Sequence, residues 1–272
     1  LAASTKQIIS DNTFGSNNFG GNSIEFGIRE HAMGGIVNGL ALHSNLMPYG
    51  STFLVFSDYM RPSMRLASLM NVNSLFIFTH DSIYLGEDGP THQPIEHLMS
   101  LRLIPNLDVI RPSNSMELIH SYRYALEKRD NPKAIILSRQ NMKFFDNDVS
   151  YKDFQTGAYE FMPGKDITLV ATGSELELAF EISKNLKDLS VQIISAPILN
   201  KINKERIESL NLNQNIFTLE LGRSTGWDSY IENITRSFSI DSFGESAPIE
   251  DLTEKYNFSA EKISDEIRSL LN

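Results

Sequence analysis

Short apolar runs alternate with longer amphipathic stretches along the first half of the chain. Buried strands are predicted where Val, Ile, Leu and Phe cluster, over 51–56, 74–80, 107–113 and 133–140. Helices are predicted between and around these runs, over 29–43, 59–71, 94–103 and 115–129. In the helix predicted over 115–129, apolar side chains recur every three or four residues, at Met116, Ile119, Tyr122 and Leu126. This is the spacing of one helix face. Strands that alternate with helices in this way predict a parallel sheet covered on both faces.

Residues 144–165 interrupt this rhythm, and we place a domain boundary inside them. The prediction is an α/β domain over 1–150 followed by a smaller α/β domain over 151–272. In the second domain, strands are predicted over ITLVAT, VQIISAPIL and NIFTLEL, and helices over SELELAFEISKNL and SAEKISDEIRSLL. We expect residues 1–24, rich in Ser, Asn, Gly and Thr, to form a loop or a mobile lead-in.

Composition and charge narrow the function classes. The net charge of −10 argues against non-specific nucleic-acid binding, which needs a basic surface. No apolar stretch approaches the about 18 residues of a membrane span, so no membrane partner is predicted. The absence of cysteine excludes disulfides, thiolate metal sites and cysteine nucleophiles. All six histidines lie within the first 120 residues, which places histidine chemistry in the first half.

Polar segments follow three of the predicted strands. SDYMR follows the first, DSIYLGEDGPTHQP the second, and QN follows KAIILSR. Ligands of open parallel sheets bind outside the carboxyl ends of the strands. We therefore expect these segments to meet at one edge of the sheet.

Two groups of side chains in the first half have both a structural and a functional interpretation. Glu30 opens a predicted helix, where an acid either complements the helix dipole or faces a ligand; His31 beside it is interpreted as a packing residue. Phe53, Phe56 and Tyr59 recur at three-residue intervals. They form either core aromatics or a shelf for a flat heterocycle.

The segment THDSIYLGEDGPTHQP holds His80, Asp88 and His92. The histidines are twelve positions apart, which does not resemble the spacing of a zinc site. The glycines and prolines also explain a plain turn. Arg139, at the end of the last predicted strand of this half, either binds an anion or forms a surface salt bridge.

The segment ATGSE (171–175) has some likeness to a phosphate-binding turn at a helix N-terminus. With one glycine, it is interpreted mainly as a turn between strand and helix. Ser174 and Glu177 have the spacing of a capping box, so the pair is predicted to cap the following helix.

Long motifs give these segments a shared meaning. IREHAMGGIVNGLALH, LMPYGSTFLVFSDYMRPSMRLASLM, THDSIYLGEDGPTHQP and ILSRQN resemble the pyrimidine-binding domain of transketolase, and ATGSE with FGESAPIEDL resembles its C-terminal domain. The resemblance runs nearly end to end. It implies a parallel-sheet, thiamine-diphosphate pyrimidine-binding domain followed by a smaller α/β domain.

The resemblance implies transfer of a two-carbon ketol unit between sugar phosphates in the pentose phosphate pathway, using thiamine diphosphate. It also implies a cytoplasmic homodimer, whose cofactor sits between two chains. The C-terminal domain is expected to contribute little to the active site. Mg²⁺ or Ca²⁺ would be held by a separate N-terminal domain, and no metal ligand is expected in these 272 residues.

Residue by residue, Glu30 and His92 match the family's catalytic positions. Glu30 corresponds to the glutamate that hydrogen-bonds the cofactor's aminopyrimidine ring, and His92 to the histidine that binds the hydroxyls of the ketol unit. An aromatic pocket around the pyrimidine is expected from Phe53, Phe56 and Tyr59. Sugar-phosphate contacts are expected from Ser4, His80, Asp88, His92 and Arg139, with Asp88 on the C2 hydroxyl.

One departure from the family concerns the diphosphate half of the cofactor site. The family's Gly-Asp-Gly motif does not occur in this sequence, and GEDG is not equivalent to it. The sequence also opens with LAAST rather than with methionine. We expect the chain to be part of a longer transketolase that is inactive without the N-terminal domain.

Other functions remain open at this stage. The chain could be one subunit of a split transketolase or a non-catalytic assembly fragment. Dihydroxyacetone synthase, deoxyxylulose-phosphate synthase and the β subunits of ketoacid dehydrogenases share the domain plan. The histidine-bearing segment and the SRQN ending favour transketolase over the last two.

Overall fold

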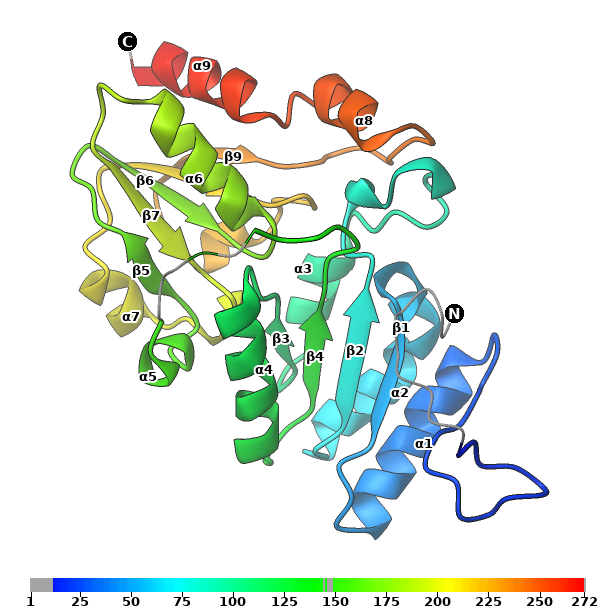
Figure 1. The fold of residues 1–272 in the computed structure, drawn as a ribbon. Coiled ribbons are helices and arrows are strands. Elements are labelled where there is room, and N and C mark those ends of the chain that lie inside the picture. The colour runs from blue at the N-terminus through cyan, green and yellow to red at the C-terminus, as the bar shows by residue number, and fades with distance from the viewer. Residues whose placement is uncertain (1–11, 144, 146–148, 272) are drawn as a thin grey trace.

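The computed structural model describes residues 12–143, 145 and 149–271. Two sheets, each with its own helices, form two α/β units that lie side by side (Figure 1). The described residues 12–24 form turns with isolated bridges between Thr13 and Ser23 and between Gly15 and Asn18. No helix in the described part of the chain is long and apolar enough to cross a membrane.

The first sheet is parallel throughout, with strands in the order β1-β2-β4-β3. Its strands are β1 (Tyr49–Phe53), β2 (Leu75–Thr79), β3 (Asp108–Ile110) and β4 (Lys133–Ile136). Its helices are α1 (Glu30–His43), α2 (Ser57–Leu69), α3 (His97–Arg102) and α4 (Ser115–Glu127). Short 3-10 turns follow two strands, η1 (Leu54–Phe56) after β1 and η2 (Ile83–Asp88) after β2.

Both faces of the first sheet are buried, as expected for a parallel sheet. Phe76 and Phe78 of β2 point to the face covered by α1, α2 and α3. Their neighbours Leu75 and Ile77 point to the opposite face, against Tyr124 and Ala125 of α4. This two-residue alternation explains why the strand reads as an unbroken apolar run.

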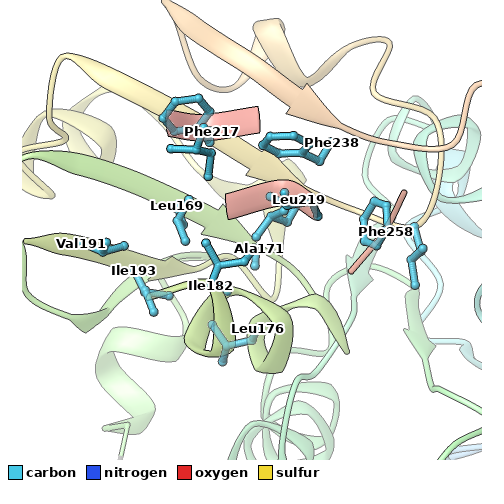
Figure 2. Close-up of a cluster of buried hydrophobic side chains, with 14 of the residues drawn as sticks. Leu169, Ala171, Leu176, Ile182, Val191, Ile193, Phe217, Leu219, Phe238 and Phe258 are labelled. Carbon is cyan, nitrogen blue, oxygen red and sulfur yellow. The ribbon is translucent and has the colours of Figure 1, made fainter. Parts of the chain in front are cut away.

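The second sheet is mixed, with strands in the order β5-β7-β6-β8-β9. Its strands are β5 (Tyr159–Met162), β6 (Ile167–Ala171), β7 (Val191–Ser195), β8 (Asn215–Leu219) and β9 (Ile234–Phe238). Its helices are α5 (Tyr151–Phe154), α6 (Glu175–Asn185), α7 (Lys204–Ser209), α8 (Ile249–Lys255) and α9 (Ala260–Leu271), with 3-10 turns η3 (Leu199–Lys201) and η4 (Trp227–Ser229). Only β5 runs antiparallel to its neighbour. Figure 2 shows the core on one face, where Ile182 of α6 lies near Ala171 of β6 and Phe217 lies beside Phe238.

The predicted α/β class and first parallel sheet are confirmed, but some local predictions are wrong. The run 51–56 is strand only to Phe53, because the backbone then coils into η1 and α2. The capping box does not form: Ser174 has helical φ and ψ, and its Oγ donates to Glu175 Oε1 at 2.5 Å. The Glu177 carboxylate instead pairs with Lys143 Nζ at 2.7 Å.

The helix 115–129 exists as α4, but its regularly spaced apolar residues are not its buried face. Ile119 and Leu126 are 57% and 53% exposed, whereas Glu117 is fully buried. Glu117 accepts hydrogen bonds from Ser113 N, Tyr159 Oη and Ser195 Oγ at 2.6–2.8 Å. These donors satisfy its carboxylate, so the helix turns a polar side toward the second sheet.

Candidate active site at the carboxyl edge of the first sheet

The carboxyl ends of β1, β2 and β4 bring distant segments of sequence together. Phe53 at the end of β1 is in register with Thr79 at the end of β2. On the other side, Leu137 N donates to Phe78 O at 2.7 Å, which carries the chain toward Arg139. The segments that follow the three strands therefore meet at this edge, as the sequence predicts.

Aromatic rings from three segments form a continuous wall at this edge. Phe53 stacks on Phe56 with 5.8 Å between ring centroids and on His80 at 3.8 Å. His92 meets Phe56 edge-on at 5.5 Å. Tyr59 lies 6.2 Å from Phe56 and is exposed, so it stands at the rim of the wall. Such a surface suits a flat aromatic ligand.

His80 sits in a conformation that only a few per cent of non-glycine residues adopt. Its φ is +61° although it has a side chain, and it is 8% exposed. His80 Nδ1 lies 2.8 Å from Thr79 Oγ1. Burial and the nearby positive charge of Arg139 lower the pKa of His80, while Asp88 and Asp81 act in the opposite direction. The lowered pKa favours the neutral ring, which can donate one N–H hydrogen bond to an anion.

Asp88 and His92 lie on the loop that leaves β2. Asp88 ends η2 and is exposed, and His92 is half-buried with Nδ1 2.9 Å from Thr91 Oγ1. Two tight bends shape the loop at Gly86 (φ +81°) and Gly89 (φ +77°), values that a side chain would strain. His80 interacts electrostatically with Asp88, His92 and the exposed Arg139. These four side chains form one polar group beside the aromatic wall.

Glu30 is the first residue of α1 and is only 5% exposed. Helix α1 lies very close to α2 at Gly34. A Cβ there would lie 2.8 Å from Met60 Cγ and from Ser63 Cβ. His31 is exposed, with Nδ1 3.4 Å from Ser63 Oγ, so it belongs to this helix contact. An acid as buried as Glu30 fits a ligand that supplies a hydrogen-bond donor.

One group of three metal-ligating side chains occurs among the described residues. The ligand atoms of Asp58, Glu96 and His97 lie within 4.8 Å of one another, with His97 Nε2 3.1 Å from Asp58 Oδ2. The group does not include His80 or His92. Ser4, the remaining predicted substrate contact, lies outside the described residues.

A buried ionic network beside the site was not predicted from the sequence. Arg111, which follows β3, donates to Asp81 Oδ2 through Nε and Nη2 at 3.0 and 2.7 Å. It also donates to Thr172 O at 2.9 Å and to Glu175. A Cβ on Gly173 (φ +56°) would lie 2.7 Å from Arg111 Nε, so arginine fills the space over the ATGSE turn. The signal in the sequence is a charged residue, Arg111, inside the run 107–113 that is predicted as a buried strand.

Family models match both halves of the chain. The model of the transketolase pyrimidine-binding domain matches residues 3–144, and the transketolase-like C-terminal domain matches residues 157–259. The chain belongs to the transketolase family. The resemblance found in its motifs is thereby confirmed.

Curated and solved transketolases align with nearly the whole chain. Transketolase of Staphylococcus aureus strain MW2 is 41% identical over 284 aligned positions, which cover 99% of this chain and 43% of the relative. A crystal structure of Pichia stipitis transketolase in complex with sedoheptulose-7-phosphate superposes with a TM-score of 0.91 at 32% identity, covering 99% of this chain and 42% of that one. The chain thus spans less than half the length of these relatives.

A further solved structure is similar in length as well as in fold. It is described as a split-gene transketolase, an inactive β4 tetramer, and superposes with a TM-score of 0.78 at 26% identity. The alignment covers all of this chain and 89% of that chain.

The described residues fit one half of the thiamine diphosphate of this family. An aromatic wall and the buried acid Glu30 suit an aminopyrimidine ring. The diphosphate and its metal have no matching Gly-Asp-Gly segment in the sequence.

Proposed function

We propose that this chain supplies the pyrimidine-binding and sugar-binding half of a transketolase active site. The observation that carries the proposal is the meeting of Phe53, Phe56, His80 and His92 at one sheet edge. The reaction is the transfer of a two-carbon ketol unit from a ketose phosphate to an aldose phosphate in the pentose phosphate pathway. We place it in the cytoplasm.

On the cofactor side, Phe53, Phe56 and Tyr59 would hold the pyrimidine ring, and Glu30 would share a proton with its N1′ atom. Bound thiamine diphosphate would supply a carbon nucleophile that accepts the ketol unit. The buried position of Glu30 strengthens a hydrogen bond there, because the local dielectric is low. Glu30 would thus act in general acid–base catalysis through the ring.

On the substrate side, we assign the side chains to parts of the sugar phosphate by their charge and position. His80 and Arg139, with Ser4 from the part of the chain not described, would bind the sugar phosphate, since a guanidinium and an imidazole N–H donor suit a dianion. Asp88 would accept a hydrogen bond from the C2 hydroxyl, and His92 would bind the hydroxyls of the ketol unit. His92 already lies edge-on to Phe56, beside the proposed ring site.

The chain would need a diphosphate-binding domain, which also holds Mg²⁺ or Ca²⁺. That domain either belongs to the same polypeptide or is a separate subunit. The alignment with the split-gene transketolase covers 89% of that chain. This supports the arrangement in which the diphosphate-binding domain is a separate subunit. Two copies of the chain would form the homodimer that is expected from the family.

Reconstitution tests the proposal. The chain is mixed with the diphosphate-binding domain of a transketolase relative, Mg²⁺ and thiamine diphosphate, and ketol transfer from sedoheptulose-7-phosphate to an aldose phosphate is followed. We expect activity in the mixture and none with either part alone. Full activity of the chain alone would contradict the need for the second domain, and an inactive mixture that forms a stable complex would contradict the proposed reaction.

A second candidate function is a non-catalytic assembly subunit. The similarity to a split-gene chain crystallised as an inactive tetramer supports it. Light scattering of the chain with and without the added domain separates the candidates: an assembly subunit would form the complex without ketol transfer. Formaldehyde as the acceptor would separate a dihydroxyacetone synthase-like enzyme from a transketolase.

A further inference from the structure

The loop that carries Asp88 and His92 is anchored in the core of the second sheet. Ile83 and Ile95, on either side of the loop, are 0% and 5% exposed. Both belong to the apolar cluster built by Leu219, Leu252 and their neighbours on the second sheet and α8. Arg223 N also donates to Ile95 O at 2.9 Å. In Figure 1 the loop after β2 lies beside α8.

Gln93 links two parts of the loop to each other and links the loop to the segment that precedes α8. Its side chain is 2% exposed, and Nε2 donates to Gly86 O at 2.9 Å and Ile83 O at 3.3 Å. The same Nε2 donates to Glu245 O at 2.9 Å, in the segment that precedes α8. One amide group therefore fixes both the bend of the loop and its distance from residues 244–247.

Residues 244–247 fit closely around the loop. Ser246 Oγ donates to Glu87 O, one residue before Asp88. A Cβ on Gly244 would lie 1.8 Å from Gln93 Oε1, and a Cβ on Gly89 would lie 3.1 Å from Ser246 Cβ. The two segments approach so closely that glycine is required at Gly244 unless Gln93 moves.

We infer that residues 244–247 are a positioning segment for the sugar-binding loop, acting through Gln93 and Ser246. They hold Asp88 and His92 at the distance from Phe56 and His80 that a substrate needs. This inference rests on the proposed function and gives the second sheet a part in it. We class Gln93 and Ser246 as positioning residues, because their side chains bind backbone oxygens of the loop and of the neighbouring segment.

Point variants distinguish a loss of loop positioning by residues 244–247 from a general loss of stability. Gln93→Met keeps the length of the side chain but removes the donor, and Ser246→Ala removes the hydroxyl with little change in volume. Ser246→Thr retains the hydroxyl and serves as the rescue. Lys255→Ala is the matched control, because it removes an exposed ion pair with the Glu245 side chain and leaves Glu245 O in place.

The first measurement is amide hydrogen exchange of residues 86–93 in the chain itself, which needs no activity. We expect the exchange rate there to rise about tenfold in Ser246→Ala and Gln93→Met, in line with the loss of one or more hydrogen bonds. Ser246→Thr and Lys255→Ala should stay within about twofold of the parent chain. An unchanged rate in both loss variants would overturn the inference.

The second measurement is steady-state kinetics in the reconstituted enzyme. We expect KM for sedoheptulose-7-phosphate to rise about tenfold in Ser246→Ala, with the thiamine diphosphate affinity within about twofold of the parent. Faster exchange with unchanged KM and kcat would also overturn the inference. If the parent mixture is inactive, the proposed function fails, and the exchange result alone decides whether the segment holds the loop. Ser246→Ala keeps the test valid should Gln93→Met not fold.

Discussion

Arg111 and Asp81 form a fully buried ion pair, with 2.7 Å between Nη2 and Oδ2, and Asp81 is the neighbour of His80. The same guanidinium pairs with Glu175 of α6, so one cation joins the end of β2 to the second sheet. Removing it would leave two buried carboxylates without a counter-charge. The pair therefore links the stability of the chain to the place of His80.

Arg111→Met should lower the free energy of unfolding by about 3–5 kcal/mol, because buried charges lose their partner. Denaturant unfolding measures the change. Arg123→Ala is the control, since its pair with Glu127 is exposed and should contribute at most about 1 kcal/mol. Equal effects of the two substitutions would show that the buried network adds nothing.

Glu220 should make stability depend on pH in the acid range. Burial alone raises a carboxyl pKa, but here the Arg102 and Arg111 charges and Trp227 outweigh it and lower the pKa of Glu220 to about 2. Its ordinary value is 4.5, so its contribution is full above about pH 4.5 and is lost as the pH falls toward 2. The stability difference between the parent and Glu220→Gln should shrink over this range.

The measurement is denaturant unfolding of both proteins between pH 2 and 7. Glu266→Gln is the control, because its pair with Arg236 is exposed and its effect should stay small at every pH. A parent-minus-Glu220→Gln difference that does not change with pH would contradict the assignment.

The neighbours of His80 should move its titration in opposite directions. Arg139→Gln removes a charge that lowers the pKa of His80, so that pKa should rise; Asp88→Asn removes a charge that raises it, so it should fall. NMR of the imidazole protons at low ionic strength measures both shifts in the chain alone. Shifts of the same sign would contradict the arrangement at the sheet edge.

His80 should also affect stability as the pH falls. Because the pKa of His80 in the folded chain is below the ordinary value of 6.5, the unfolded chain takes up the proton first. The contribution of neutral His80 is therefore present above about pH 6.5 and decreases below it. His80→Gln should flatten this part of the stability–pH curve.

Glu30→Gln should reduce kcat of the reconstituted enzyme by about 10²–10⁴, the usual loss of one general acid–base group. An amide cannot share the proton that the proposed role requires. Glu25→Gln, an exposed position five residues earlier, is the control and should retain activity. Near-parental kcat in Glu30→Gln would favour the alternative in which Glu30 only complements the helix dipole.

Apolar periodicity predicted β2 and β4, because both strands are buried on both faces and their side chains are almost all apolar. It did not predict β5 and β9, whose residues are partly exposed. It also placed the segments of the site at one sheet edge. The pattern failed at α4, where Glu117 rather than the apolar stripe faces inward. A carboxylate buried by donors from Tyr159 and Ser195 depends on residues far along the chain, which periodicity cannot detect.

The roles of single site residues came from motifs and stay predictions. The motif THDSIYLGEDGPTHQP identified Asp88 and His92, but the importance of Gln93 was hidden. Its contacts are to backbone oxygens, including Glu245 O, 152 positions away. Arg111 was missed for the same reason, since its partner Glu175 lies beyond the interruption at 144–165.

The burial of Ile83 and Ile95 among residues of the second sheet has a consequence for how the chain unfolds. A segment that belongs to the first half by sequence is a piece of the second half by packing. The two sheets cannot melt separately, because loosening the second exposes both isoleucines and frees the loop between them. Heating should therefore give one cooperative transition, and a chain cut between the sheets should yield two interdependent pieces rather than two autonomous modules.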